Sequence, residues 1–295
     1  MSKASGTRPA TGSVLRDRSD RCPGVLRPWV AEDGGLVRLR LIGGAIAGAP
    51  LVALAEVAAR YGAGALHLTK RANLQLRGLP LDGEALRSDV VGALLGTGLV
   101  PSPAHERARN VMVSPLSGVH GGRADLRPVA AALDRLLCAD PALAALPGRF
   151  LFVLDDGRGD LLRRPLDLGL VALDHAHAQL RVGSRHWGPV VAMDDAAPAL
   201  IAQTRAFLRR RGSGTGAAWH VDELDSPLAD VRRDPAAAVD AGPLPYGDGP
   251  GYEHRAVPGG VLDAAAAVAL GRDAERRGAP LVVTPWHGLL VTAPR

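Results

Sequence analysis

The stretch that decides the fold reads Leu68-Thr69-Lys70-Arg71-Ala72-Asn73-Leu74-Gln75-Leu76-Arg77-Gly78. Polar or charged side chains alternate here with residues that can pack, and the polar set is Thr69, Arg71, Asn73, Gln75 and Arg77. Because successive side chains of a β-strand point to opposite faces, the pattern predicts that these five share one face. A strand seldom devotes a whole face to donors and cations unless something anionic or strongly polar lies over it. The stretch therefore predicts a strand that faces an anion.

The segment that leads into this stretch recurs near the C-terminus. Gly44 to Gly62 aligns without gaps with Gly260 to Gly278, and glycines match at both ends of the alignment. After a one-residue gap, residues 66–69 correspond to residues 281–284, and each copy continues into a predicted strand. The sequence therefore predicts an internal duplication.

Turn and helix signals place a compact unit of strands and helices around the first copy. A hairpin is expected from residues 25–30 and 36–42, because the turn-forming Glu32-Asp33-Gly34-Gly35 lies between them. Pro50 suits the first position of a helix and Gly62 suits its C-terminal cap. Extended segments are expected over residues 65–69 and 73–77, and a second helix over residues 83–95.

The middle of the chain has its own helices and strands. Helices are expected over residues 126–138 and 196–211, and strands over residues 150–154, 168–173, 178–183 and 190–193. A stretch rich in Pro, Asp and Gly follows and predicts a linker. The expected division is a disordered leader (1–21), a first unit (22–98), a middle domain (99–225), a linker (226–250) and the second copy of the unit (251–295).

Composition bounds the class of protein. Hydrophobic residues make up 47% of the 295 residues, which is typical of a globular chain. Lys occurs only at positions 3 and 70, so Arg supplies nearly all of the cationic side chains. Two explanations fit this bias: a GC-rich genome, or the recognition of planar anions by guanidinium groups. The net charge of +5 suits an acidic ligand and a nucleic acid equally well. No apolar run is long enough to cross a bilayer and the leader lacks an apolar core, so a soluble cytoplasmic protein is expected.

Several possible sites are set aside. Two cysteines, Cys22 and Cys138, are too few for a disulfide framework or a four-thiolate metal site. His175, His177 and His186 lack an acidic or thiolate partner at a useful spacing, so no metal site is predicted. Nucleic-acid binding is disfavoured because the sequence shows neither an aromatic stacking platform nor a groove-binding helix.

Four basic or polar clusters remain. They are Arg38 with Arg40; Arg71, Asn73, Gln75 and Arg77; Arg107, Arg109 and Asn110; and Arg149 before Phe150. Each alone is compatible with a solvated strand edge. Together they are explained by a polycarboxylate ligand, because several Arg forks can each bind a carboxylate through paired, charge-assisted hydrogen bonds.

The motifs that carry these residues resemble those of the sirohaem-type nitrite and sulfite reductase family. In the family's order they are Arg38-Leu39-Arg40-Leu41-Ile42-Gly43-Gly44, the strand from Thr69 to Gly78, Arg109-Asn110-Val111, Ser114-Pro115-Leu116-Ser117-Gly118 and Leu146-Pro147-Gly148-Arg149-Phe150. Three further motifs resemble the cobalamin-pathway branch, the precorrin-3B synthases: Cys22 to Arg27, Phe150 to Gly157, and Leu281 to Gly288. The resemblance runs from about Cys22 to Val291.

The resemblance implies an α+β fold in which two ferredoxin-like half-domains flank an α/β domain of the nitrite/sulfite reductase type. It implies that Arg40, Arg71, Asn73, Gln75 and Arg109 line a tetrapyrrole pocket, and Arg77 and Arg149 join them as candidate binding residues. Arg149 matches one of two substrate-binding lysines of the sulfite reductases, whereas Leu151 stands at the other position.

The family's cofactors are a [4Fe–4S] cluster with sirohaem or non-haem iron, and the cluster's four cysteines lie in a domain after the second half-domain. Cys22 and Cys138 lie outside the matching region, so this chain is expected not to hold a cluster by itself. Catalytic residues are not identified. Asp155 and Asp156 are candidates for acid/base or iron-binding groups, and they also suit a turn that ends a strand.

Three functions follow from the resemblance. The first is a precorrin-3B synthase-like oxidoreductase of cobalamin biosynthesis, which oxygenates a reduced tetrapyrrole. The second is a truncated relative that binds a tetrapyrrole without catalysis, or acts with a partner chain that carries the cluster. The third, a sulfite or nitrite reductase, is disfavoured by Leu151. The expected partners are a tetrapyrrole and an electron donor or cluster-bearing chain, with no nucleic acid and no membrane.

Overall fold

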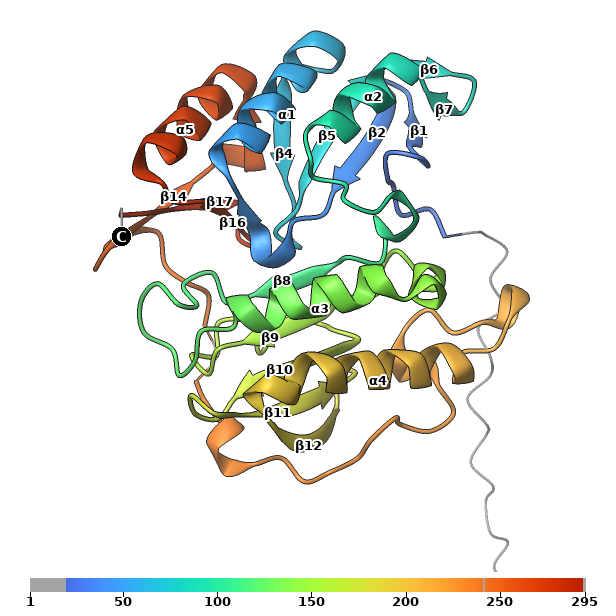
Figure 1. Ribbon diagram of the computed structural model, residues 1–295, viewed down its shortest axis with the longest axis vertical. Helices are drawn as coiled ribbons and strands as arrows, with labels where there is room; N and C mark the ends of the chain where they lie inside the picture. Colours follow the sequence, from blue (N-terminus) through green and yellow to red (C-terminus); the bar gives the residue numbers. More distant parts are fainter. Residues whose placement is uncertain (1–19, 241, 294–295) are drawn as a thin grey trace, which may run out of the picture.

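A computed structural model describes residues 20–240 and 242–293. The expected leader (1–21) lies outside these residues except for Asp20 and Arg21. Three five-stranded sheets and a two-stranded hairpin make up the sheet structure of the described chain. Figure 1 shows two of the large sheets with their helices on one side of the molecule and the third sheet with its helices on the other. No helix in the described ranges has the length and apolarity needed to cross a membrane.

The first half-domain is an antiparallel sheet backed by two helices. Its strands are β1 (Trp29–Ala31), β2 (Gly34–Leu39), β4 (Ala65–Leu68) and β5 (Leu74–Leu79), and its helices are α1 (Gly48–Tyr61) and α2 (Ser88–Gly96). The short strands β6 (Leu81–Asp82) and β7 (Ala85–Leu86) form the separate hairpin. Along β2 every second residue is buried, and β5 follows the same alternation from Leu74 to Arg77, because one face of each strand packs under the helices.

The second half-domain repeats this plan. It contains β13 (Gly247–Gly249), β14 (Tyr252–Ala256), β16 (Leu281–Thr284), β17 (Gly288–Thr292) and helix α5 (Ala264–Arg277). β13 lies inside the segment that the sequence suggests as a linker. The two half-domains exchange one strand each: β15 (Val261–Asp263) pairs with β4, and β3 (Ala45–Ile46) pairs with β16. The predicted duplication is therefore present, and its two copies are interlocked.

The backbone of the exchange is the same in both copies. Gly43 and Gly44 have φ of 61° and 75°, and Gly259 and Gly260 have φ of 61° and 69°. A Cβ on Gly44 would lie 2.2 Å from the carbonyl oxygen of Val283, so only glycine fits at this crossing. Each copy thus needs a glycine pair where its chain crosses into the other half-domain.

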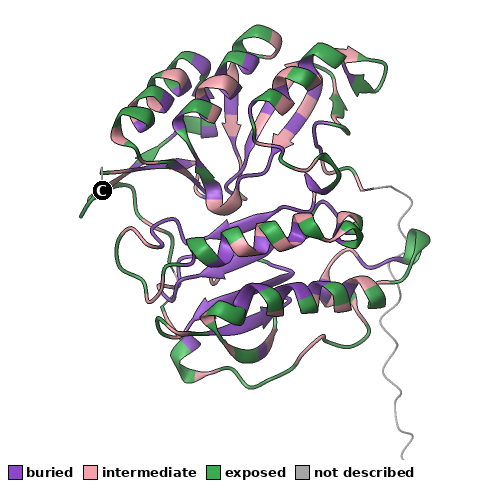
Figure 2. Cartoon of the chain, in the orientation of Figure 1, coloured by how far each residue is buried: buried purple, intermediate pink, exposed green. Residues whose placement is uncertain are grey.

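The middle domain is a mixed sheet covered by two helices. Its strand order is β12 (His186–Ala192), β11 (His177–Val182), β10 (Leu168–Ala172), β9 (Phe152–Asp155) and β8 (Val111–Val113), and its helices are α3 (Arg127–Ala139) and α4 (Ala196–Arg210). β8, β9 and β10 are parallel, and β10, β11 and β12 are antiparallel. The strands are mostly buried, and each helix has an exposed side (Figure 2).

Single-turn 3-10 helices connect many of these elements. They are η1 (Ile42–Gly44), η2 (Pro103–His105), η3 (Pro141–Ala145), η4 (Met193–Asp195), η5 (Gly214–Gly216), η6 (Val221–Glu223), η7 (Pro235–Ala237) and η8 (Pro258–Gly260).

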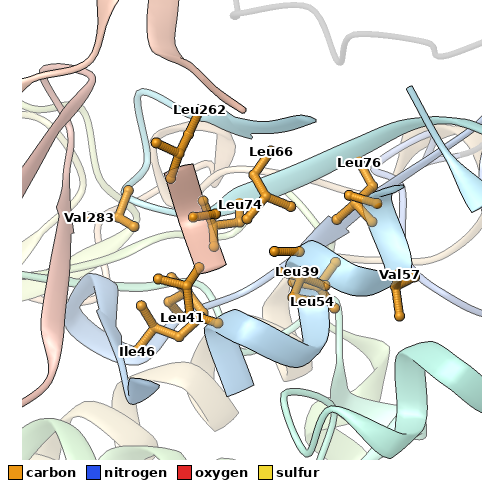
Figure 3. Close-up of a cluster of buried hydrophobic side chains, with 14 of the residues drawn as sticks. Leu39, Leu41, Ile46, Leu54, Val57, Leu66, Leu74, Leu76, Leu262 and Val283 are labelled. Carbon is orange, nitrogen blue, oxygen red and sulfur yellow. The ribbon is translucent and has the colours of Figure 1, made fainter. Parts of the chain in front are cut away.

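Two large cores match this division. One core is shared by both half-domains, and Figure 3 shows Leu262 and Val283 of the second copy close to Leu66 and Leu74 of the first. The other core fills the middle domain around Phe150, which contacts the rings of Phe152 and Phe207 at centroid distances of 5.2 and 5.1 Å. The α+β fold with duplicated half-domains is confirmed.

The two extended segments expected over residues 65–69 and 73–77 are present, but the deciding stretch is not one continuous strand, so the prediction that its five polar residues share one strand face is wrong. β4 ends at Leu68, a tight turn follows, and β5 begins at Leu74. Ala72 has φ of 56°, and the Thr69 hydroxyl accepts hydrogen bonds from the backbone N–H groups of Arg71 and Asn73. The alternating sequence therefore covers a turn followed by a strand. Thr69 is polar because its hydroxyl binds nearby backbone N–H groups and stabilises the turn, which gives the same polar–apolar alternation as a strand.

Other element predictions hold within three residues at each end, with three exceptions. The strand expected over residues 190–193 begins earlier, at His186. The first strand begins at Trp29 rather than at residue 25, because Glu106 binds the backbone N–H groups of Val25 and Leu26. The second helix begins at Ser88 rather than at residue 83, because the β6–β7 hairpin occupies the preceding residues.

Candidate anion-binding site

Four arginines gather between the first half-domain and the start of β9. This arginine cluster consists of Arg38 on β2, Arg40 directly after β2, Arg71 in the β4–β5 turn and Arg149 before β9. Arg71 Nη1 donates to the carbonyl of Arg149 at 2.9 Å, and Arg40 Nη2 donates to the carbonyl of Gly148 at 3.3 Å. Backbone carbonyls thus hold the arginines in place across two domains.

The cluster feels the charges of Glu106 and Asp167, but no described carboxylate lies close enough to form an ion pair with it. Among the described residues, none of the four arginines forms an ion pair, and the Nε atoms of Arg38 and Arg40 are buried without an acceptor. Burial, and then the nearby charge of Arg38, lower the pKa of Arg40 to about 10. Burial also lowers the pKa values of Arg38 and Arg71. Buried cations without counter-charges are costly, so this arrangement is poised to receive an anion.

The carboxylates near the cluster are occupied by other partners. Glu106 accepts hydrogen bonds from the backbone of Val25 and Leu26. Asp20 accepts from Arg107 at 2.9 Å and from the backbone N–H of Gly148. Asp167 accepts from the backbone N–H groups of Leu151 and Val221, and its burial raises its pKa to about 6.

Cys22 belongs to this neighbourhood although the sequence did not indicate it as a site residue. Its thiol interacts electrostatically with Arg38, Arg40 and Arg71. Burial raises the pKa of the thiol, and Asp20 raises it further, so the neutral form is favoured. The available sequence signal was the Cys22-Pro23-Gly24 motif, but its contact with the arginines depends on tertiary folding.

The other predicted residues in and just before β5 have protein partners. The amide oxygen of Asn73 accepts from the backbone N–H of Leu41 at 2.9 Å, and its Nδ2 donates to Asn110 Oδ1 at 2.9 Å. Gln75 accepts from Arg38 Nη2 at 3.3 Å and so lies beside the cluster. Arg77 is exposed and pairs with Asp33 at 3.0 Å.

Arg109 is not part of the cluster and lines a cavity of about 900 Å³. Its guanidinium binds both carboxylate oxygens of Asp134 on α3, at 2.6 and 2.9 Å. The cavity is enclosed by η1, the segment after β8, helix α3 and the end of the second half-domain. Arg40 is the one residue of the arginine cluster that also lines it. The structure therefore divides the predicted residues between a cation cluster and a neighbouring cavity.

Asp155 and Asp156 lie at the carboxyl end of β9, where ligands often bind in α/β folds. Asp155 accepts hydrogen bonds from the backbone N–H groups of Gly157, Gly159 and Leu161, which fits a turn that ends a strand. Asp156 is paired with Arg158 at 2.7 Å. Asp160 lies near both, and burial raises its pKa to about 7.

The residues present do not fit a [4Fe–4S] cluster, which is normally held by four cysteine thiolates. The chain contains two cysteines, and both are free. Within the described ranges, no group of three or more His, Cys, Asp or Glu side chains is arranged to hold a metal ion.

Three comparisons relate parts of this chain to known proteins. Residues 30–83 match the family model described as the nitrite/sulfite reductase ferredoxin-like half domain. A precorrin-3B synthase of Sinorhizobium sp is 31% identical over 150 residues, which cover 50% of this chain and 30% of that protein. The structure of the Mycobacterium tuberculosis NirA protein matches with a TM-score of 0.61 and 17% identity, over 90% of this chain and 56% of that chain.

The matches thus span less than a third of the curated relative and a little over half of the solved one. The matched half domain contains β1, β2, α1, β4 and β5, and it supplies three of the four arginines of the cluster. The NirA match extends the shared fold to the middle domain and the second half-domain. The chain therefore carries the ferredoxin-like half domain of the nitrite and sulfite reductases, within the fold that it shares with NirA.

Proposed function

We propose that the chain binds an acidic tetrapyrrole at the arginine cluster, as part of a precorrin-3B synthase-like oxidoreductase of cobalamin biosynthesis. The observation that carries the proposal is a group of four arginines, none of which forms an ion pair with a described carboxylate. The similarity to a precorrin-3B synthase supports the choice of a tetrapyrrole as the anion.

The electrostatic cost of burying the cluster's charge favours a ligand with several carboxylates. Burial lowers the pKa of Arg40 from its ordinary value to about 10, which corresponds to an electrostatic cost of about 3 kcal/mol for keeping that buried charge. A carboxylate placed against the cluster recovers part of this energy and forms charge-assisted hydrogen bonds. A tetrapyrrole carries several carboxylates on one rigid ring, so it can engage several arginines without further ordering.

The four arginines differ in what they can do. Arg149 is exposed and Arg38 and Arg71 are half-buried, so these three are suited to direct contact with ligand carboxylates. Arg40 is 3% exposed and donates to two backbone carbonyls, so we assign it a positioning and electrostatic role. Gln75 orients Arg38, and Asn73 anchors the turn that presents Arg71.

A second candidate function is tetrapyrrole binding without catalysis, or catalysis only with a partner chain that carries a cluster. The presence of only two cysteines favours it over an activity of this chain alone. Reduction of sulfite or nitrite is disfavoured, because Leu151 is 4% exposed and packs with Met112 and Val153. An apolar side chain there offers no charge to a small oxyanion.

A titration tests the proposal. Uroporphyrin III, an octacarboxylate tetrapyrrole, is added to the purified chain and its fluorescence is followed, with iron and acid-labile sulfide measured on the same protein. Arg71→Ala and Arg38→Ala each remove one charge-assisted pair and should weaken binding about ten- to a hundredfold. Arg276→Ala is the matched control, because Arg276 is a surface arginine paired with Asp273. Absence of binding, or equal affinity in all three variants, would overturn the assignment.

A further inference from the structure

Ser114 links the cavity to a buried carboxyl group that the proposed function does not use. It follows β8 directly, is 1% exposed and is one of the residues that line the cavity. Its hydroxyl oxygen lies 2.7 Å from Asp160 Oδ1 and accepts the backbone N–H of Asp156 at 3.1 Å. The other carboxyl oxygen of Asp160, Oδ2, is buried without a partner.

The protonation state of Asp160 decides where the Ser114 hydrogen can go. A serine hydroxyl has one hydrogen to donate, and a carboxylate can only accept. When Asp160 is ionised, Ser114 donates to it and has no hydrogen left for the cavity. When Asp160 is protonated, it can donate to Ser114 Oγ, which frees the serine hydrogen to rotate toward the cavity.

We propose that Ser114 is a switchable hydrogen-bond donor to the cavity, and that a proton on Asp160 turns it toward a bound ligand. The ligand group that it recognises is an acceptor, such as a carboxylate or ring carbonyl. This inference rests on the proposed function, because Arg40 lies at both the arginine cluster and the cavity, so that a tetrapyrrole held at the cluster can reach Ser114. Ser114 is then a ligand-contacting group, and Asp160 is a positioning residue.

The surroundings of Asp160 support a proton at neutral pH. The charged groups that face it are Asp155, Asp156, Arg158 and Arg164. Arg158 is bound to Asp156, and Arg164 lies over the ring of Trp286 and donates to the carbonyl of Pro285. Burial and the two neighbouring aspartates together raise the pKa of Asp160 to about 7. No histidine is among the described residues that line the cavity, so protonation of a cavity histidine does not contribute to the pH dependence of binding.

The experiment measures uroporphyrin III affinity between about pH 6 and 8.5, where free carboxyl groups with ordinary pKa values near 4 stay ionised. The wild-type affinity should fall about five- to tenfold across this range, since one hydrogen bond is lost. Asp160→Asn keeps a donor beside Ser114 and should bind tightly without this dependence. Ser114→Ala should bind weakly at every pH, and Ser114→Thr should restore the wild-type profile. Asp225→Asn, at an exposed carboxylate, should leave the profile unchanged.

An infrared pH titration of the ligand-free protein gives a second readout. A protonated-carboxyl band that titrates near pH 7 should be present in the wild type and in Ser114→Ala, and absent from Asp160→Asn. Loss of binding at all pH values would overturn the proposed function and this inference with it. Binding that retains its pH dependence in Asp160→Asn, or a band that survives in that variant, would overturn only the switch.

Discussion

Replacement of Asn73 by alanine tests whether this residue holds the two domains together. The change removes the acceptor for the Leu41 N–H and the donor to Asn110 Oδ1, which lies in the middle domain. Asn73 and Asn110 are each 1% exposed and Leu41 is 2% exposed, so water cannot easily replace either bond. Each buried group left without a partner costs about 1–3 kcal/mol, so we expect a loss of about 2–5 kcal/mol in the free energy of unfolding.

Urea denaturation followed by circular dichroism measures this loss. Asn73→Asp should cost less than Asn73→Ala, because it keeps an acceptor for Leu41 and disrupts only the contact with Asn110. Gln75→Ala is the matched control two residues further along the chain: its side chain is half-exposed and makes one bond of 3.3 Å, so it should cost less than about 1 kcal/mol. If Asn73→Ala unfolds within 1 kcal/mol of the wild type while uroporphyrin affinity collapses, Asn73 is a ligand contact and the reasoning here is refuted.

Two further predictions concern stability. Asp160 has a pKa near 7 in the folded chain against 3.8 for an ordinary Asp, so the folded state holds this proton more tightly than the unfolded state. This proton stabilises the folded state at low pH, and the stabilisation is lost as the pH rises toward 7. In urea denaturation, the free energy of unfolding of the wild type should therefore fall by about 2–3 kcal/mol relative to that of Asp160→Asn between pH 5 and 8. A difference between the two proteins that stays constant with pH would contradict the prediction. Gly44→Ala should lower the melting temperature severely, because its Cβ would lie 2.2 Å from the Val283 carbonyl oxygen. Gly64→Ala has a similar φ of 73° and open space, so it should cost only about 1 kcal/mol, and equal losses in both variants would refute the steric argument.

Local patterns predicted the regular elements well where one face of an element is buried. Helix α3 was expected over residues 126–138 and spans Arg127–Ala139, since its apolar residues recur at helical spacing and pack in the middle core. Alternation failed in the β4–β5 turn for an equally local reason. Thr69 is polar there because it stabilises the turn, and Asn73 is polar because it binds Asn110 of the middle domain. A strand with one polar face would show the same alternation of polar and apolar residues.

The residues of the candidate site also fall into two groups: those that the sequence motifs indicated and those that only the structure could place. The motifs drew attention to Arg40, Arg71 and Arg149, and the structure places them beside Arg38. Arg77 and Arg109 carry the same charge but pair with Asp33 and Asp134, which are distant from them in sequence. No spacing rule distinguishes a paired arginine from an unpaired one, because the partner comes from another element.

By itself the sequence determined the duplication, the succession of helices and strands, and the presence of arginines in and beside strands that pack in the core. These properties depend on residues close in the chain and on its resemblance to known motifs. Only the tertiary structure decided that the half-domains exchange strands, which arginines lack a counter-charge, and that Ser114 meets Asp160 at the cavity. Such properties depend on distances between residues tens of positions apart, and the packing of the two cores sets those distances.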